Sequence, residues 1–335
     1  MRDVRAALAF CAALLLALPG YAEPVQLKFG YPGPLTAWPY TKGFGPWAQE
    51  VERDAPGLVE IKVYPGGAIA TFRNAYDRTI NGVADMTFGT FGDTPGQFPR
   101  TEVSNLPFEA DNGTAASIAL WKLYQGGVIA PEYGSVKPLV IFTFPSSIVH
   151  ATKEIKTAAD MQGLKFAVSG RIAAEAVTRL GGAPVTMSQT ELYPALQRGM
   201  VQASNTSWPG AMAWKLEEVT KYHLEVPFGL APGFILMNKD SFARLPEPAR
   251  GAIDRHSGAA LSLRMGKAAD ETNVEGKAKF IAMGGHVVAA LDPAETARWK
   301  QALAPITGEW IKTVPDGTAV LAAFRAELVN ARRAQ

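Results

Sequence analysis

The sequence predicts an α/β fold of two lobes, joined by crossing strands and long helices, with a ligand cleft between them. The stretch from Met161 to Trp208 alternates apolar runs with helical periods, which predicts strand, helix, strand and helix in succession. The chain has 335 residues, enough for two domains of ~100–200 residues each. Strand ends and helix starts of an open α/β sheet gather on one rim, so a small ligand is expected there.

The first strand of this stretch, Leu164 to Val168, leads directly into a helical period that begins at Ile172. Between strand and helix stand Ser169, Gly170 and Arg171. We expect Ser169 to cap the exposed amides of the helix and Gly170 to let a ligand approach the backbone. Arg171 would then lie beside the positive end of the helix, a favourable place for a carboxylate.

A second strand, 183–187, precedes Ser188 and Glu191, whose spacing matches a capping box at the start of a short helix. This helix is expected to end at Gly199. The arrangement repeats the strand-to-helix corner of the first pair. Both corners are therefore expected on the same rim of the sheet.

The motifs of this stretch, taken in order, resemble the central signature of the solute-binding proteins of tripartite ATP-independent periplasmic (TRAP) transporters. These motifs are Gly163-Leu164-Lys165, Leu180-Gly181, Glu191-Leu192-Tyr193, Ala195-Leu196-Gln197 and Gly199. Further segments of the chain resemble other landmarks of that family, namely Tyr64-Pro65-Gly66-Gly67, 82–88, Leu106-Pro107-Phe108, 215–221 and 238–245. The resemblance covers nearly the whole mature chain and implies a periplasmic-binding-protein-like fold. It also implies a permease partner with small and large membrane subunits, and uptake driven by an ion gradient rather than by ATP.

The chain departs from the family pattern at two places. The family usually carries a substrate-binding arginine at the fourth position after Gly163, and this chain has Ala167 there, so Arg171 is a candidate replacement. The family also favours an acidic residue and a glycine where this chain has Gln202 and Ala203. The ligand therefore cannot be copied from the acidic-sugar or dicarboxylate binders of the family.

Residues 1–22 are predicted to be a secretory signal peptide that is removed before Glu23. Arg2 and Arg5 precede an apolar run that is too short to span a membrane, and small residues follow it. The alternative, a short buried helix, is disfavoured because the run shows no amphipathic pattern. The single cysteine, Cys11, lies in this leader, which removes disulfides and thiolate chemistry from the mature chain. The expected location is the periplasm.

The overall composition is that of an ordinary globular protein. Hydrophobic residues make up 47% of the chain and charged residues 19%, with a formal net charge of +2. This near-balance gives no indication of nucleic-acid binding or of attraction to an anionic membrane. No fixed-period repeat or low-complexity segment is present.

The first lobe is predicted to comprise residues 23–148 together with about 235–284, and the second lobe residues 149–234. Residues 285–335 are predicted to form tail segments that pack on both lobes. Long helical segments follow Pro246 and Pro293. Long helices bracing two lobes suit a hinged binding protein that closes on its ligand, and they suit a rigid two-domain enzyme equally well.

Candidate ligand contacts outside the stretch 161–208 are aromatic or lie on loops beyond strand ends. They are Trp38 after the first strand, Phe88, Thr90 and Phe91 around the loop 89–99, and Phe234 on the return strand. The loop is rich in glycine and proline but lacks the Gly-Lys-Ser/Thr ending of a phosphate loop. Packing of these aromatic side chains at the edge of the core is an equally good alternative.

Candidate contacts in the second lobe are Arg171, Ser169, Tyr193, Asn205 and Trp208. Arg171 is expected to form a bidentate pair with a ligand carboxylate, and Ser169 to add a further hydrogen bond. The alternative for Arg171 is an ion pair with Glu175, four residues along the same helix face. Trp208 is expected to stack on a planar ligand or to fill space, and Tyr193 to face either the cleft or the core.

No arrangement typical of catalysis, metal binding or cofactor binding is found in the sequence. The four histidines, His150, His223, His256 and His286, do not show metal-ligand spacing, and each is expected to be structural or exposed. Neither a GxSxG nucleophile elbow nor a GxGxxG loop after a strand is present. The acidic pairs Glu217-Glu218 and Asp270-Glu271 fall on different helix faces because they are adjacent in sequence.

The sequence therefore predicts a periplasmic solute-binding protein that captures a small organic acid and passes it to a membrane permease without making or breaking a bond. An aromatic or other hydrophobic monocarboxylate is the expected ligand, because aromatic side chains are plentiful and second cationic anchors are not. Three alternatives are a binding protein of an ATP-driven importer, an exported hydrolase or lyase, and a structural interaction protein.

Overall fold

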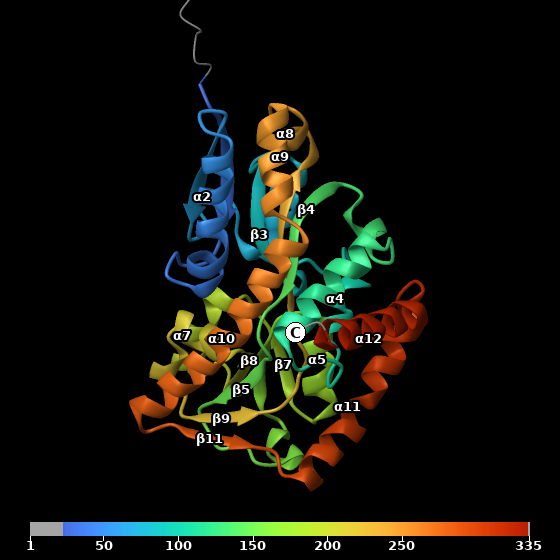
Figure 1. Cartoon of the computed structure of the whole chain (residues 1–335). Helices are drawn as coiled ribbons and strands as arrows, with labels where there is room; N and C mark the ends of the chain where they lie inside the picture. Colours follow the sequence, from blue (N-terminus) through green and yellow to red (C-terminus); the bar gives the residue numbers. More distant parts are fainter. Residues whose placement is uncertain (1–22, 334–335) are drawn as a thin grey trace, which may run out of the picture.

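The computed structural model describes residues 23–333, so the predicted signal peptide and Cys11 lie outside the described residues. Two separate β-sheets form the centres of two lobes, which confirms the predicted two-lobed α/β architecture (Figure 1). No helix among residues 23–333 is both long and apolar enough to cross a membrane.

The first sheet has five strands in the order β2-β1-β3-β10-β4. Its strands are β1 (Val25–Tyr31), β2 (Val59–Pro65), β3 (Met86–Thr90), β4 (Val136–Thr143) and β10 (Pro232–Asn238). β1 runs parallel to β2 and β3, whereas β10 is antiparallel to both β3 and β4. β10 is buried along its whole length because the sheet encloses it on both edges and helices cover its faces.

The second sheet has six strands in the order β11-β9-β5-β8-β6-β7. Its strands are β5 (Ile148–Ala151), β6 (Lys165–Val168), β7 (Ala183–Thr186), β8 (Ala203–Thr206), β9 (Tyr222–Glu225) and β11 (Val287–Ala290). β6 pairs in parallel with β7 and β8, so the segments that follow these three strands lie at one edge of the lobe.

The helices are α2 (Gly45–Asp54), α3 (Ala75–Ile80), α4 (Gly113–Gln125), α5 (Arg171–Arg179), α6 (Leu192–Gln197), α7 (Trp208–Ala213), α8 (Lys239–Ala243), α9 (Glu247–His256), α10 (Ala259–Met283), α11 (Pro293–Thr313) and α12 (Gly317–Arg333). Single helical turns span Pro39–Phe44, Phe72–Asn74, Phe91–Asp93, Thr101–Asn105, Ala130–Tyr133, Ala158–Met161, Gln189–Glu191 and Leu216–Glu218.

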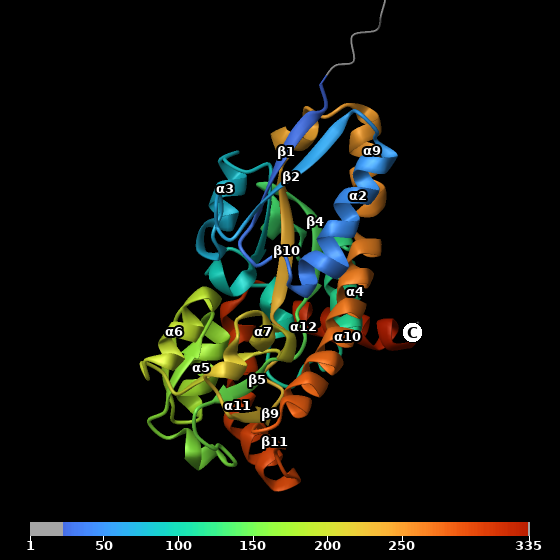
Figure 2. The same ribbon diagram turned by 90° about the vertical axis from the view of Figure 1, so that its left-hand side faces the viewer.

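Four connections join the lobes, and the last is the path from α11, which packs on α5 in the second lobe, to α12, which packs on α4 in the first. The chain passes from β4 to β5 through residues 144–147 and returns from β9 to β10 through 226–231. The third connection is α10, which packs on β4 in the first lobe and on α7 in the second, and runs down one side of the molecule from the first lobe into the second in Figure 2. After α10 the chain adds β11 to the second sheet, and α11 packs on α5.

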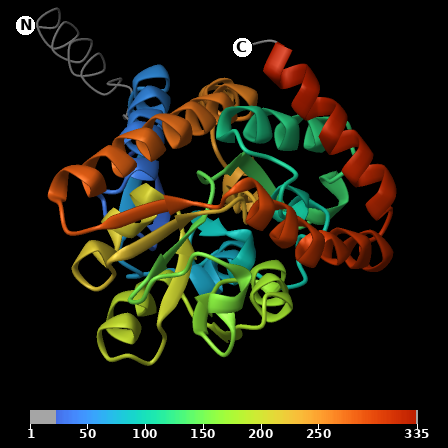
Figure 3. The same ribbon diagram turned by 90° about the horizontal axis from the view of Figure 1, so that it is seen from below.

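The helix α4 lies between α10, α12 and β4, and Figure 3 shows α12 beside it. Close packing of α4 on α10 depends on Gly266, where a Cβ atom would lie 2.7 Å from the Cα of Thr114. The Asp270 carboxylate accepts hydrogen bonds from the amides of Gly113 and Thr114 at the start of α4. These contacts hold the bracing helix α10 against the core.

Candidate functional site

A cavity with about 980 Å³ of empty space, part of it open to solvent, lies between the two lobes. It forms where the segments after β1, β3, β6, β7 and β8 converge, which is where ligands bind in α/β sheets. The lining residues are Tyr31, Gly33, Pro34, Ala37, Trp38, Pro39, Phe72, Phe88, Thr90, Gly92, Asn105, Phe144, Pro145, Ser147, Ser169, Ala173, Gln189, Asn205, Thr206, Ser207, Pro209, Gly210, Ala213, Trp214 and Ala231.

The first lobe contributes an aromatic wall centred on Phe88. The Phe88 ring lies 5.0 Å from that of Tyr31, 6.0 Å from that of Phe72 and 6.1 Å from that of Phe144. Trp38 extends the wall by meeting Phe144 edge to face. These rings pack against one another and together form an apolar surface that suits a flat apolar body.

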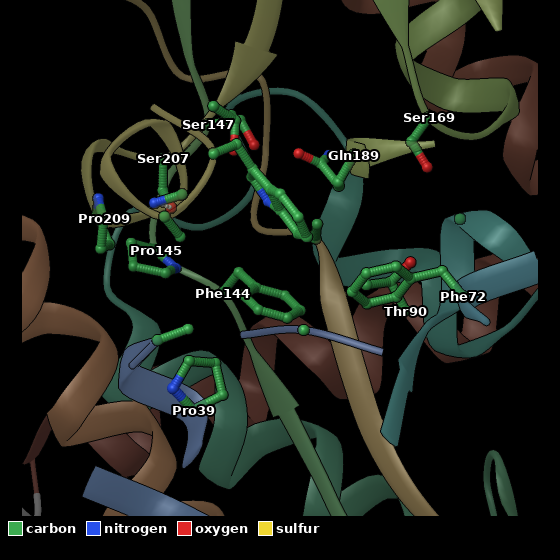
Figure 4. A pocket seen from close by; sticks show the side chains of 18 of the residues that line it. Pro39, Phe72, Thr90, Phe144, Pro145, Ser147, Ser169, Gln189, Ser207 and Pro209 are labelled. Carbon is green, nitrogen blue, oxygen red and sulfur yellow. Dashed lines mark hydrogen bonds between the residues drawn. The ribbon is translucent and has the colours of Figure 1, made fainter. Parts of the chain in front are cut away.

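The second lobe contributes neutral polar groups. In Figure 4 the labelled side chains of Gln189 and Ser207 face those of Phe72 and Phe144 across the cavity. Asn205 at the end of β8 and Ser169 after β6 also line it. The parallel strands β6, β7 and β8 all end at this edge of the second sheet, so the polar residues at or just after their ends lie around the cavity.

The lobes touch each other across the mouth of the cleft. A Cβ atom at Gly92 would lie 3.1 Å from the Ser169 Oγ, and one at Gly170 would lie 3.2 Å from the Cα of Gly92. Arg73 Nη2 lies 2.6 Å from Glu191 Oε2, which joins the first lobe to the second. The cleft is therefore closed on this side by direct contacts between the lobes.

Five of the ten predicted ligand contacts line the cavity, namely Trp38, Phe88, Thr90, Ser169 and Asn205. Their assignment to ligand contact remains a prediction. The predicted capping role of Ser169 was wrong, because Gly170, with φ 85°, is the N-cap residue of α5 and no side chain caps that helix. The predicted capping box of Ser188 and Glu191 is confirmed.

Arg171 does not line the cavity. Its side chain is 51% exposed, and its Nη1 lies 3.6 Å from Glu175 Oε2, the i,i+4 partner that was the alternative from sequence. The first residue of α5 points its side chain along the outer face, because Ile172 and Ala173 turn the buried face inward. Ala167, at the position of the family arginine, is buried in the second lobe.

Four other predicted contacts lie outside the cavity lining. Phe91 and Phe234 pack edge to face in the core with ring centroids 5.0 Å apart, because Phe91 begins a turn that directs it away from Phe88. Trp208 is fully buried against Phe280, with ring centroids 5.0 Å apart. Tyr193 donates a hydrogen bond to Glu218 on the surface of the second lobe.

Several lining residues were missed from sequence, above all Phe144, Gln189 and Trp214. The signal for Gln189 was available, since it follows the end of β7 just as Ser169 follows the end of β6. Phe144 begins the first crossing between the lobes, a place where an aromatic side chain meets the cleft. Trp214 ends a segment, 205–214, that was expected to form a wall after the central stretch, and it reaches Phe72 across the cleft with ring centroids 6.3 Å apart.

Three histidines that are far apart in sequence form a chain in the second lobe. The Nδ1 atoms of His150 and His223 lie 2.8 Å apart, and His223 Nε2 lies 3.0 Å from His286 Nδ1. Burial lowers the pKa of His223 to about 4, helped by the charge of His286. The ring nitrogens meet pairwise, and no group of three or more metal-ligating side chains among residues 23–333 is arranged to hold a metal ion.

Two half-buried carboxyl groups in the first lobe have shifted pKa values. Burial raises the pKa of Asp93, against the hydrogen bond from Thr90 and the charge of Arg73. Burial also raises the pKa of Glu102 to about 7, although the positive charge of Arg171 opposes this shift. Arg171 therefore has acidic neighbours in both lobes, Glu102 and Glu175.

The family model for bacterial extracellular solute-binding proteins, family 7, matches residues 36–313, which is most of the chain. The chain belongs to this family. The predicted membership of the TRAP solute-binding proteins is thereby confirmed. Members of this family are solute receptors, which agrees with a cleft between two lobes.

The relatives and solved structures below match this TRAP solute-binding protein over nearly its whole length. The C4-dicarboxylate-binding periplasmic protein of Rhodobacter capsulatus is 25% identical over 97% of this chain and 98% of its own length. A marine metagenome TRAP solute-binding protein specific for aromatic acid ligands, in complex with 3-hydroxybenzoate, is 27% identical with a TM-score of 0.87. The match covers 92% of this chain and 99% of that one.

A TRAP solute-binding protein from Rhodoferax ferrireducens, in complex with copurified benzoate, is 26% identical to this chain with a TM-score of 0.88. It also covers 92% of this chain and 99% of its own. Both solved TRAP solute-binding proteins therefore share the two-lobed fold over 92% of this chain.

Proposed function

We propose that this chain is the extracytoplasmic receptor of a TRAP transporter, which captures a small organic solute and delivers it to membrane permease subunits for ion-gradient-driven uptake. The proposal rests chiefly on the cavity between the lobes and on its aromatic wall of Tyr31, Phe72, Phe88 and Phe144. A small organic acid with an aromatic or other hydrophobic body is supported by the two solved relatives that bind benzoate and 3-hydroxybenzoate. The proposed location is the periplasm, after removal of residues 1–22.

Capture is tested by a thermal-shift screen of small aromatic and aliphatic acids together with their neutral counterparts. A ligand that binds only the folded state raises the unfolding temperature by mass action. Phe144→Ala, in the cavity wall, is expected to reduce that increase, whereas the matched truncation Met200→Ala, at a side chain 59% exposed, is expected to keep it. Failure of every solute to raise the unfolding temperature contradicts the proposal.

Delivery to a permease is tested in cells by deleting the gene for this chain and following uptake of the captured solute. Uptake is expected to stop, and in unmodified cells it is expected to collapse when the ion gradient is dissipated while ATP is maintained. Uptake that instead follows ATP would assign the chain to an ATP-driven importer. Turnover of the captured solute by the purified protein would favour the exported hydrolase or lyase.

A further inference from the structure

We infer that the cleft holds its solute in an uncharged form, through hydrogen-bond donors of the solute itself, as in an aromatic amide, an aromatic alcohol or a protonated aromatic acid. This inference rests on the proposed function and narrows its ligand. An organic acid fits such a site only as the protonated species.

The cavity lining contains no ionic side chain. None of the residues that line it, all within the described part of the chain, is an arginine, lysine, histidine, aspartate or glutamate. A carboxylate that leaves water for an aromatic cleft must recover its lost hydration from a counterion or from several donors. The lining offers no counterion, and its hydroxyl and amide groups recover less of that hydration energy than a paired charge does, so an anion is disfavoured relative to its neutral counterpart.

The unpartnered buried side-chain atoms of the lining are both acceptors. Asn205 Oδ1 and Gln189 Oε1 are both buried and have no hydrogen-bond partner in the protein. Thr90 donates its hydroxyl proton to Asp93, which leaves the lone pairs of its Oγ for the cavity. A buried acceptor without a donor is costly, and a ligand hydroxyl or N–H removes that cost whereas a carboxylate cannot.

Arg73 and Arg171, which lie close in sequence to lining residues, both contact acidic side chains. Arg73 is held by Glu191 at 2.6 Å across the mouth, and Arg171 lies 3.6 Å from Glu175. The carboxyl group of Asp93 stands directly behind Thr90. Each of these two arginines therefore faces an acidic side chain rather than the cavity, and neither lines it.

Four probes of nearly equal shape test the inference, namely benzoate, benzamide, 3-hydroxybenzoate and 3-hydroxybenzamide. Calorimetric titration of the mature protein at pH 7.5 is expected to give at least tenfold tighter binding for each amide than for its acid. Lowering the pH by two units raises the protonated fraction of the acids about 100-fold, so their affinity is expected to rise steeply. The amides do not titrate, so any change of their affinity with pH reports an effect on the protein itself. The charged groups near the cleft that could cause such an effect are Arg73, Asp93, Glu102, Arg171, Glu175 and Glu191.

Asn205→Asp tests whether residue 205 accepts a hydrogen bond from the ligand, because aspartate presents only acceptor oxygens whereas asparagine presents an oxygen and an NH2 group. A ligand that donates to Oδ1 is expected to bind this variant as tightly as before, or up to about tenfold tighter through a charge-assisted bond. Both acids are expected to bind it at least tenfold more weakly than the unaltered protein. Arg171→Ala is expected to change no affinity by more than about twofold.

Tighter binding of the carboxylates at pH 7.5 would overturn the inference and leave the proposed function standing. So would a loss of acid binding in Arg171→Ala, or a loss of amide binding in Asn205→Asp. If a different solute from the screen binds, it is compared with its own acid or amide counterpart by the same criterion. Absence of any bound solute would instead remove the proposed function.

Discussion

Arg73 Nη2 donates to Glu191 Oε2 at 2.6 Å across the mouth of the cleft, from the turn after β2 to the turn after β7. Glu191 also accepts a hydrogen bond from the amide of Ser188, so the carboxylate is oriented by its own helix start before it meets Arg73. The hydrogen bond from the Ser188 amide is the main reason why the pKa of Glu191 lies below its usual value, and Arg73 lowers it further. Desolvation of the carboxylate opposes this shift. A preoriented acceptor of this kind favours the closed arrangement of the lobes.

Arg73→Gln is expected to weaken ligand affinity by less than about fivefold, because exposed ion pairs contribute only ~0.2–1 kcal/mol. The loss is expected to vanish at high salt, where the pair is screened. Calorimetric titration at two salt concentrations measures it. The control is Lys42→Gln, which removes a similarly exposed pair with Glu275 away from the cavity. An equal effect of both variants on affinity would show that the pair plays no part in closure.

Gly229→Ala is expected to be among the most destabilising single substitutions in the return crossing. Gly229 has φ +99°, and a Cβ atom there would lie 2.3 Å from the backbone oxygen of Asn105. Gly284→Ala is the matched control, since its φ is +71° with nothing within 4 Å, and it is expected to cost about 1 kcal/mol. Gly229→Ala is expected to cost at least about 2 kcal/mol more. Equal unfolding midpoints in urea would contradict this.

His223→Gln is expected to flatten the dependence of stability on pH between about 6.5 and 4. Burial, with the charge of His286, lowers the pKa of His223 to about 4, so the folded protein keeps this imidazole neutral while the unfolded chain protonates it. The free energy of unfolding therefore falls as pH falls through this window, by roughly 2 kcal/mol for this group. Urea unfolding at pH 7.5, 5.5 and 4.5 measures the slope.

The control for that experiment is His256→Gln, at a partly exposed histidine of the first lobe that pairs with Asp54 at 2.8 Å. The steep acid dependence is expected to persist in this control. If His223→Gln kept the slope of the unaltered protein, the histidine chain would not be its source.

Glu102→Gln is expected to stabilise the protein at pH 8 by roughly 2 kcal/mol and to change little at pH 4.5. Burial raises the pKa of Glu102 to about 7, so the folded state retains a proton that the unfolded state loses above about 4.5. The free energy of unfolding consequently falls as pH rises from 4.5 to 7. Thermal unfolding of this variant and of Glu60→Gln, at an exposed position of β2, separates burial from the loss of a charge. A destabilised Glu102→Gln at pH 8 would contradict the assigned cause.

The amino-acid sequence by itself determined the elements of the cleft and their order. The apolar run before Ser169, the period after Arg171 and the capping box at Ser188 specify β6, α5 and the start of α6, because these signals are local. The rule that strand ends share a rim then placed Ser169 and Asn205 at the cavity.

Only the tertiary structure decided which side chains of those elements face the ligand space. Arg171 turns to Glu175, and Phe91 joins Phe234 in the core, because the packing of each element against its neighbours sets its rotation. Contacts between distant segments, such as Arg73 with Glu191 and His150 with His223, leave no pattern in a single sequence. The cavity is lined by uncharged side chains from both lobes, and these residues are far apart in sequence, so only the tertiary structure shows that the lining is uncharged.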